Sequence, residues 1–86
     1  MTTVATMKER LASLDPEHVE VIDDSAQHAG HIGARDGGGH YRIHIVSERF
    51  AGLPTMARHR LVYDALGTLM EGAIHALSIT ARTPAE

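Results

Sequence analysis

Polar and apolar residues alternate through the middle of the chain, and this alternation sets the centre of the predicted fold. Every second residue from Tyr41 to Ile45 is apolar, and the residues between them are polar. The polar positions are His40, Arg42 and His44. A period of two is typical of a strand with one face in the core and the other in solvent. The pattern therefore predicts a central strand from His40 to Ser47.

The chain before this strand is predicted to form one helix and one further strand. Apolar residues three to four positions apart favour an amphipathic helix from Thr3 to Leu14, with Thr3 as its cap. Pro16 ends this helix because proline disfavours helical geometry in the residue before it. Renewed alternation then predicts a short strand from His18 to Ile22.

The chain after the central strand is predicted to form a helical segment and a third strand. Pro54 suits the first turn of a helix, and apolar residues from Val62 to Leu69 continue it along one face. Gly67 is expected to divide this segment into two helical pieces. The last strand is predicted from Ile74 to Arg82. One face of it is expected to hold His75, Leu77, Ile79 and Ala81.

The order of these elements, α-β-β-α-(α)-β, predicts a small single domain of the α/β (α+β) class over residues 1–86. The first two strands follow one another and are expected to be antiparallel. The third strand is reached through a helical crossover, which usually gives a parallel, right-handed connection. We therefore expect a three-stranded mixed sheet with helices covering one face.

A long segment without helical or strand pattern separates the first two strands. It lies between Ser25 and Gly39 and is rich in glycine and alanine. Hairpins need two to five connecting residues, and loops longer than about twelve residues are usually functional or disordered. The length of this segment therefore asks for an explanation, and two of its residues are His28 and His31.

Composition limits the chemistry that this chain can supply. It has 86 residues with no cysteine and seven histidines, and its formal charge is −3. No disulfide, thiol nucleophile or thiolate ligand can come from it. The histidines lack the nucleophile and carboxylate partners of a catalytic constellation, so the chain is not expected to be an enzyme.

The location of the protein in the cell is predicted from two kinds of segment, membrane spans and secretory signals. The chain has no run of about twenty apolar residues that could cross a bilayer. Its first ten residues lack the apolar core of a secretory signal. A cytoplasmic location is therefore expected.

Four blocks of this sequence resemble the BolA family. They are HYRI at 40–43, IVSERFAG at 45–52, RHRLVYDAL at 58–66 and IHALSITARTP at 74–84. The blocks occur in the family's order and near its spacing. The resemblance implies a fold close to the type II KH domain and partnership with a monothiol glutaredoxin of the CGFS type. It further implies that a 2Fe-2S cluster is shared with that glutaredoxin and its bound glutathione. The isolated chain would then carry no cluster and be a monomer or a weak homodimer.

Histidine ligands for this cluster are expected from two places. Histidine can replace cysteine on one iron of a 2Fe-2S cluster, and the partner would supply the thiolates. His75 opens the last predicted strand and matches the family's histidine in the block IHALSI. Counting forward from Ser25 makes His28 the loop ligand, whereas counting back from His40 makes it His31. We favour His31, because its nine-residue distance to His40 reproduces the family's spacing. A zinc site formed by His28, His31 and His40 is an alternative.

Nucleic-acid binding is the alternative function, because some family members are described as transcriptional regulators or morphology factors. The candidate residues are Arg49, Arg58, His59 and Arg60. Residues 40–60 contain four arginines and one glutamate, a charge of +3 within a chain of −3. Four phosphate contacts would give a log–log salt slope of only about −3.6, so any DNA binding is expected to be weak. The GxxG loop of KH domains is also missing after Gly52. Docking of a protein partner or surface ion pairing explains these arginines equally well.

Overall fold

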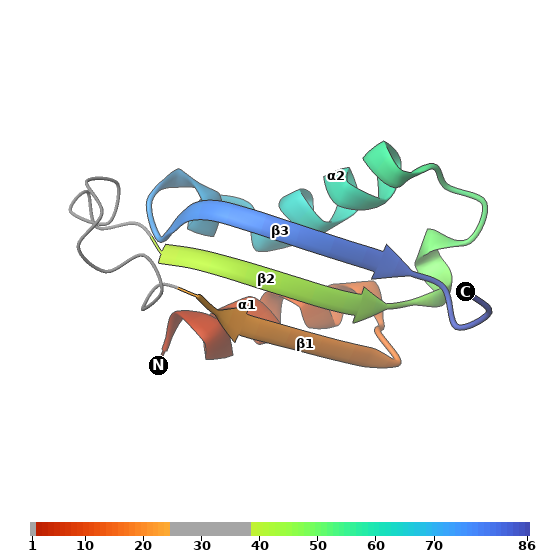
Figure 1. Cartoon of the computed structure of the whole chain (residues 1–86), viewed down its shortest axis with the longest axis horizontal. Helices are drawn as coiled ribbons and strands as arrows, with labels where there is room; N and C mark the ends of the chain where they lie inside the picture. Colours follow the sequence, from red (N-terminus) through yellow and green to blue (C-terminus); the bar gives the residue numbers. More distant parts are fainter. Residues whose placement is uncertain (1, 25–38) are drawn as a thin grey trace.

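The elements of the fold follow the chain in the predicted order (Figure 1). The computed structural model describes residues 2–24 and 39–86. Its helices are α1 (Thr3–Leu11) and α2 (Thr55–Leu66), and its strands are β1 (His18–Asp23), β2 (Gly39–Val46) and β3 (Ile74–Arg82). Short 3-10 turns lie at Ala12–Leu14, Glu48–Phe50 and Gly67–Glu71. The predicted long loop falls on residues 25–38, outside the described residues.

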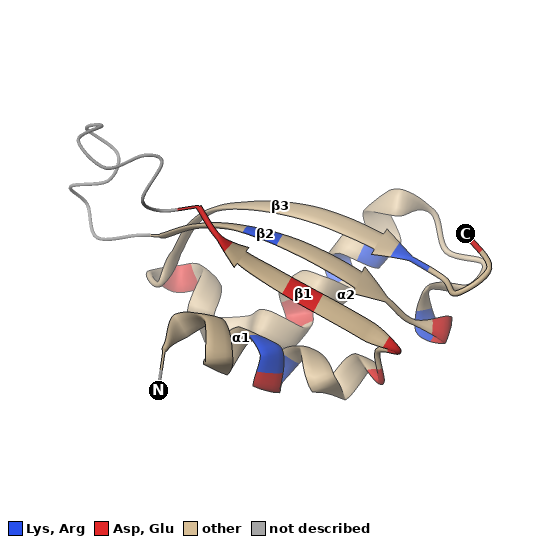
Figure 2. Ribbon diagram, turned by 60° about the horizontal axis from the view of Figure 1, so that its bottom comes forward, with Lys and Arg blue, Asp and Glu red and all other residues tan. Residues whose placement is uncertain are grey.

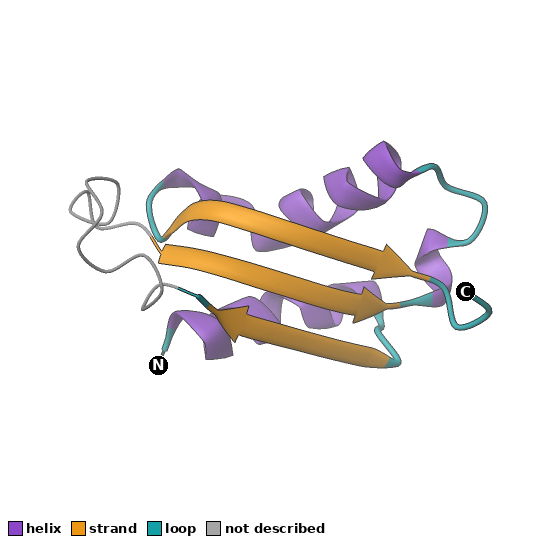
Figure 3. Ribbon diagram, viewed as in Figure 1, coloured by secondary structure: helices purple, strands orange, loops and turns teal. Residues whose placement is uncertain are grey.

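The three strands form one mixed sheet with β2 at its centre. β1 runs antiparallel to β2, with His18 opposite Val46, and β3 runs parallel to β2. Both helices lie on the same face of the sheet, as Figure 3 shows. The predicted α+β class, the mixed sheet and the helical crossover are therefore confirmed. The other face of the sheet carries no helix in the described part of the chain.

The core lies between the helices and the covered face of the sheet. Its apolar side chains are Met7, Leu11, Leu14, Val21, Tyr41, Ile43, Ile45, Phe50, Val62, Leu66 and Ile74. The alternation of β2 decides which side of that strand joins the core, because Tyr41 and Ile45 are buried while Arg42 between them is exposed. Phe50, in the turn between β2 and α2, is the largest side chain that is completely buried.

The first helix differs from the prediction at both ends. Its cap is Thr2 rather than Thr3, because the hydroxyl of Thr2 accepts a hydrogen bond of 3.1 Å from the N–H of Ala5. The α-helix gives way to a 3-10 turn that ends at Leu14. Asp15 then takes a left-handed conformation with φ 49°, which lets the chain reverse into β1. Leu14 is still buried in the core, so the apolar spacing of the helix continues through the 3-10 turn.

β3 differs from the prediction at its start. Its pairing with β2 shifts by one residue between Gly39 and His40, which leaves His75 as an extra residue in β3. His75 and Ala76 are therefore both exposed, although regular alternation would turn one of them inward. The prediction that His75 shares a face with Leu77 is wrong, because this β-bulge turns the histidine outward.

Candidate metal-ligand site

His75 lies beside His40 at one end of the sheet. Their ring centres are 5.3 Å apart, and the ring planes are inclined by 53°. His40 lies on the open side of β2 by strand alternation, and the bulge in β3 brings His75 to the same side. His75 is exposed, whereas His40 is half-buried. Sequence reasoning assigned His40 only to a polar strand face and to a zinc alternative, and missed this contact with His75.

The distance between these rings suits two ligands of one metal ion. Two imidazoles that bind zinc at a tetrahedral angle place their ring centres about 5 Å apart, given Zn–N bonds of about 2.0–2.1 Å. Within residues 2–24 and 39–86, however, no three histidine, cysteine, aspartate or glutamate side chains converge on a common metal position. Any further ligands beside His40 and His75 therefore have to come from outside these residues.

His28 and His31 lie in the segment 25–38, outside the described residues. The two described ends of this segment, Asp24 and Gly39, lie at the same end of the sheet as the histidine pair (Figure 1). The backbone N–H of Asp24 donates a hydrogen bond of 2.8 Å to the carbonyl of His40. The segment that carries both loop candidates is therefore attached directly beside the pair at each of its ends.

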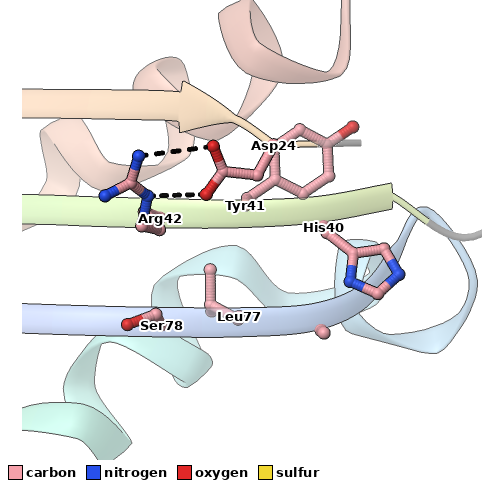
Figure 4. A pocket seen from close by; sticks show the side chains of 7 residues that line it. Asp24, His40, Tyr41, Arg42, Leu77 and Ser78 are labelled. Carbon is pink, nitrogen blue, oxygen red and sulfur yellow. Dashed lines mark hydrogen bonds and ion pairs between the residues drawn. The ribbon is translucent and has the colours of Figure 1, made fainter. Parts of the chain in front are cut away.

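A shallow pocket of about 320 Å³ adjoins the histidine pair (Figure 4). It is lined by Asp24, His40, Tyr41, Arg42, Ala76, Leu77 and Ser78. Along β3 the small residues Ala76 and Ser78 lie opposite His40 and Arg42, and this difference in side-chain size opens the pocket. The Nε of Arg42 donates a hydrogen bond of 2.6 Å to Asp24, which fixes the guanidinium at its rim. The sequence shows that Ala76 and Ser78 are small, but the pocket follows from this only when the register with β2 is known.

Arg58, a candidate for nucleic-acid binding, is used within the fold. Its side chain is only 14% exposed. It donates hydrogen bonds of 2.8 Å to the carbonyl of Leu53 and 3.1 Å to the carbonyl of Ala81. It also donates a hydrogen bond of 2.8 Å to the carboxylate of Glu86. These contacts tie the start of α2 to the end of β3.

The other three nucleic-acid candidates belong to two different elements, the turn Glu48–Phe50 and the helix α2. Arg49 forms an ion pair of 2.5 Å with Asp15, whereas Arg60 is exposed on α2 next to the half-buried His59. An open pocket of about 330 Å³ on α2 is lined by Met56, His59, Arg60 and Tyr63. In Figure 2 the basic residues are spread over helices and sheet with acidic residues near them. The structure therefore brings only His59 and Arg60 together on one surface.

The contact between Arg58 and Glu86 is expected to make part of the free energy of unfolding depend on pH. The hydrogen bond from Arg58, with a second from the N–H of Thr83, lowers the pKa of Glu86 from 4.5 to about 2. Because the folded-state pKa is the lower one, this contact stabilises the fold above pH 4.5 and is lost as the pH falls towards 2. The free energy of unfolding of wild type should therefore exceed that of Glu86→Gln at pH 6, and the difference should shrink between pH 4.5 and 2.

Urea titrations at a series of pH values measure this difference. Glu71→Gln is the matched control, because Glu71 is exposed and sits outside the ion pairs found among the described residues. The same titrations on Glu71→Gln measure the effect of removing an exposed carboxylate that lies outside these ion pairs. A difference for Glu86→Gln that does not change with pH would contradict the prediction.

Comparison with known sequences supports the family assignment. The family described as BolA-like protein matches residues 11–86. SufE-like protein 1, chloroplastic/mitochondrial, of Arabidopsis thaliana is 49% identical over 78 residues, covering 85% of this chain and 21% of that protein. BolA-like protein 1 of Homo sapiens is 45% identical over 74 residues, covering 86% of this chain and 52% of that protein. The chain thus spans about a fifth of the first relative and about half of the second.

Solved structures agree with the sequence comparison over the whole fold. BolA1 from Arabidopsis thaliana has a TM-score of 0.83 at 34% identity, covering 100% of this chain and 96% of that chain. The BolA domain of SufE1 from Arabidopsis thaliana has a TM-score of 0.82 at 41% identity, covering 99% of this chain and 96% of that chain. Fold and sequence together define a small, non-catalytic α+β domain. The chain belongs to the BolA family, which confirms the resemblance and the expectation that it is not an enzyme.

Two observations bear on where the protein acts. No helix among the described residues has the length and apolar character needed to cross a membrane. The names of two relatives, SufE-like protein 1, chloroplastic/mitochondrial, and protein BOLA1, chloroplastic, both from Arabidopsis thaliana, refer to organelles. These names give no support to the expected cytoplasmic location, which stays a prediction.

Proposed function

We propose that this chain is an adaptor in iron–sulfur cluster trafficking or in signalling of iron status. Its partner would be a monothiol glutaredoxin of the CGFS type with bound glutathione, and the two proteins would share a 2Fe-2S cluster. The observation that carries this proposal is the contact of His75 with His40, whose ring centres are 5.3 Å apart. The pair lies at the end of the sheet that is joined to segment 25–38. Family membership is consistent with such a partner.

The donor atoms of the chain fit one half of such a cluster. With no cysteine, it offers imidazole and carboxylate ligands only, so thiolates have to come from the partner. In this proposal His75 and the loop histidine His31 bind iron. His40 packs against the ring of His75 and limits its rotation. Because imidazole binds a metal only when it is neutral, the hold on the cluster would weaken in acid.

Reconstitution tests the proposal directly. The purified chain is mixed with a monothiol glutaredoxin, glutathione, ferric iron and sulfide. Native mass spectrometry is expected to show one copy of each protein with two irons and two sulfides. The visible circular dichroism should differ from that of the glutaredoxin alone. If the glutaredoxin takes up the cluster with an unchanged spectrum and the chain stays outside the complex, the proposal is wrong.

The two loop histidines are expected to differ in their effect on this complex. His31→Ala should shorten the lifetime of the shared cluster, whereas His28→Ala should leave it nearly unchanged. The reason is that His31 is closer to the strand that anchors the loop, while closure entropy depends only slowly on loop length. The lifetime is measured as the decay of visible absorbance after addition of an iron chelator.

Each other outcome of the loop experiment has a distinct meaning. The opposite pattern would make His28 the ligand. If neither variant nor the double variant changes the decay, the loop supplies no ligand and His75 is left as the ligand from this chain.

DNA binding by a transcriptional regulator is the second candidate, supported by His59 and Arg60 beside the pocket on α2. It ranks lower because Arg49 and Arg58 are engaged in ion pairs within the fold. Arg42 is paired with Asp24 as well, so of the four arginines in residues 40–60 Arg60 is left, and one phosphate contact would give a log–log salt slope of only about −0.9. Such binding would be weak at physiological salt.

The remaining expectations form part of the same proposal. Residues 1–86 make one domain. The isolated chain carries no cluster, is a monomer or a weak homodimer, and acts in the cytoplasm. Sedimentation of the isolated chain across a range of concentrations measures its oligomeric state.

A further inference from the structure

A second pair of histidines lies on the open face of the sheet, on β1 and β2. The ring centres of His18 and His44 are 5.6 Å apart, and their planes are inclined by 70°. His18 begins β1 and is exposed, and His44 lies on β2 with its side chain half-buried. Strand alternation places both on the side opposite the core, because Val19 and Ile45 next to them face the helices. The proposed cluster function makes no use of this pair.

A carboxylate stands next to the two rings. Glu20 lies directly opposite His44 in the antiparallel ladder and two residues beyond His18 on the same strand. Residues directly opposite one another have Cβ atoms about 4.5–5.5 Å apart, and residues i and i+2 share a face. Glu20 is exposed. Three side chains that bind divalent metals therefore project from one small area of the open face.

The spacing of the two rings is compatible with one metal ion between them. Imidazoles on one zinc ion place their ring centres about 5 Å apart, with Zn–N bonds of about 2.0–2.1 Å. The observed 5.6 Å is a little over half an ångström longer than this spacing. In their present rotamers the three side chains do not converge on one point, since no group of three metal-binding side chains does so within the described residues. The step required is a change of rotamer that brings Glu20 and the ring nitrogens towards a common point.

We propose that His18, His44 and Glu20 form a surface site for a divalent transition-metal ion, with zinc as the expected occupant. Two imidazoles and one carboxylate with water in the fourth position is a donor set that zinc accepts in proteins. Calcium and magnesium prefer sites built from oxygen ligands, so the two imidazoles select against them. The nearby Arg42 does not oppose a cation strongly, because its charge is balanced by Asp24 at 2.6 Å.

This site is separate from the proposed cluster site. Its ligands come from β1 and the later part of β2, whereas His75 and His40 lie at the start of β3 and β2. The inference rests on the contact between His18 and His44 and on the register that places Glu20 opposite His44. The proposed metal site does not depend on glutaredoxin binding.

A titration of the full chain with zinc chloride, followed by NMR of the imidazole groups, tests the proposal. At less than one equivalent of zinc, the signals of His18 and His44 are expected to move together. His18→Asn should weaken the zinc response of His44 at least about tenfold, because loss of even a supporting group typically costs 10–100-fold in metal affinity. Glu20→Gln should weaken the responses of both rings, since the amide keeps the shape of the side chain but loses its charge.

His59→Asn is the matched control, because this histidine lies on α2 away from the sheet surface. It should leave the zinc response of His18 and His44 unchanged. Amide spectra of all variants verify folding, which is expected to be retained because His18 and Glu20 are exposed.

Three results would overturn the proposal. In the first, zinc moves only the signals of other histidines. In the second, His44 responds to zinc equally well without His18. In the third, the stoichiometry is one zinc for two chains, which would show that a second copy supplies the ligands. Reconstitution of the cluster with His18→Asn is measured in parallel and is expected to be normal, which keeps a failure of this site distinct from a failure of the proposed function.

Discussion

The His75→Ala variant is expected to fold, to bind the glutaredoxin and to lose most of the visible spectrum of the shared cluster. His75 is exposed at the end of the sheet, so its removal leaves no cavity and little change in stability. The chain has no thiolate to take its place. We expect the lifetime of the cluster in the presence of a chelator to fall by at least about tenfold, since even the loss of a group that only supports a metal ligand costs 10–100-fold in affinity.

Two further variants separate ligation from packing at this site. His59→Ala removes an imidazole on α2, far from the pair, and should leave the spectrum and lifetime unchanged. His40→Ala removes the neighbouring ring at 5.3 Å, and should shorten the lifetime less than His75→Ala if His40 only orients its neighbour. An unchanged spectrum and lifetime in His75→Ala would exclude this residue from the cluster site.

Phe50→Ala is expected to have the largest effect on stability. Phe50 lies in the turn between β2 and α2, where it is completely buried and belongs to the hydrophobic core. Replacing a buried phenylalanine by alanine costs about 3–5 kcal/mol. Domains of this kind are stable by only about 5–15 kcal/mol in total. The variant should therefore be partly unfolded at physiological temperature.

Thermal and urea unfolding of the variant measure this loss. A loss of 3 kcal/mol should lower Tm by at least about 12 °C, because each kcal/mol shifts a domain of this size by about 4–8 °C. Met56→Ala is the control, since its side chain is 81% exposed and the substitution should change the free energy of unfolding by less than about 0.5 kcal/mol. Equal midpoints for the two variants would contradict the account of the core given above.

The central strand and the class of the fold could be predicted because they depend on local pattern. The alternation from Tyr41 to Ile45 determines which side of β2 faces the helices, and the structure follows it residue by residue. The bulge at His75 could not be predicted in this way. Its cause is the register between β2 and β3, which is a property of two strands and not of one.

The candidate site was predictable only in part, for the same reason. His75 was identified through its sequence block, but its contact with His40 depends on parallel pairing of strands that are distant in sequence. In the sequence, Arg58 is one of three neighbouring basic residues. Its actual partners, among them Ala81 and Glu86, come from the far end of the chain and are visible only in the folded protein.

The bulge places His75 where it can be present or absent without altering the pairing of β2 with β3. If His75 were simply deleted, Ile74 would still pair with Gly39 and Ala76 with His40, and β3 would alternate regularly throughout. The sheet is therefore geometrically complete without this residue. A chain of this design can gain or lose an outward-facing side chain by insertion or deletion of a single codon, while every other pair in the ladder keeps its place.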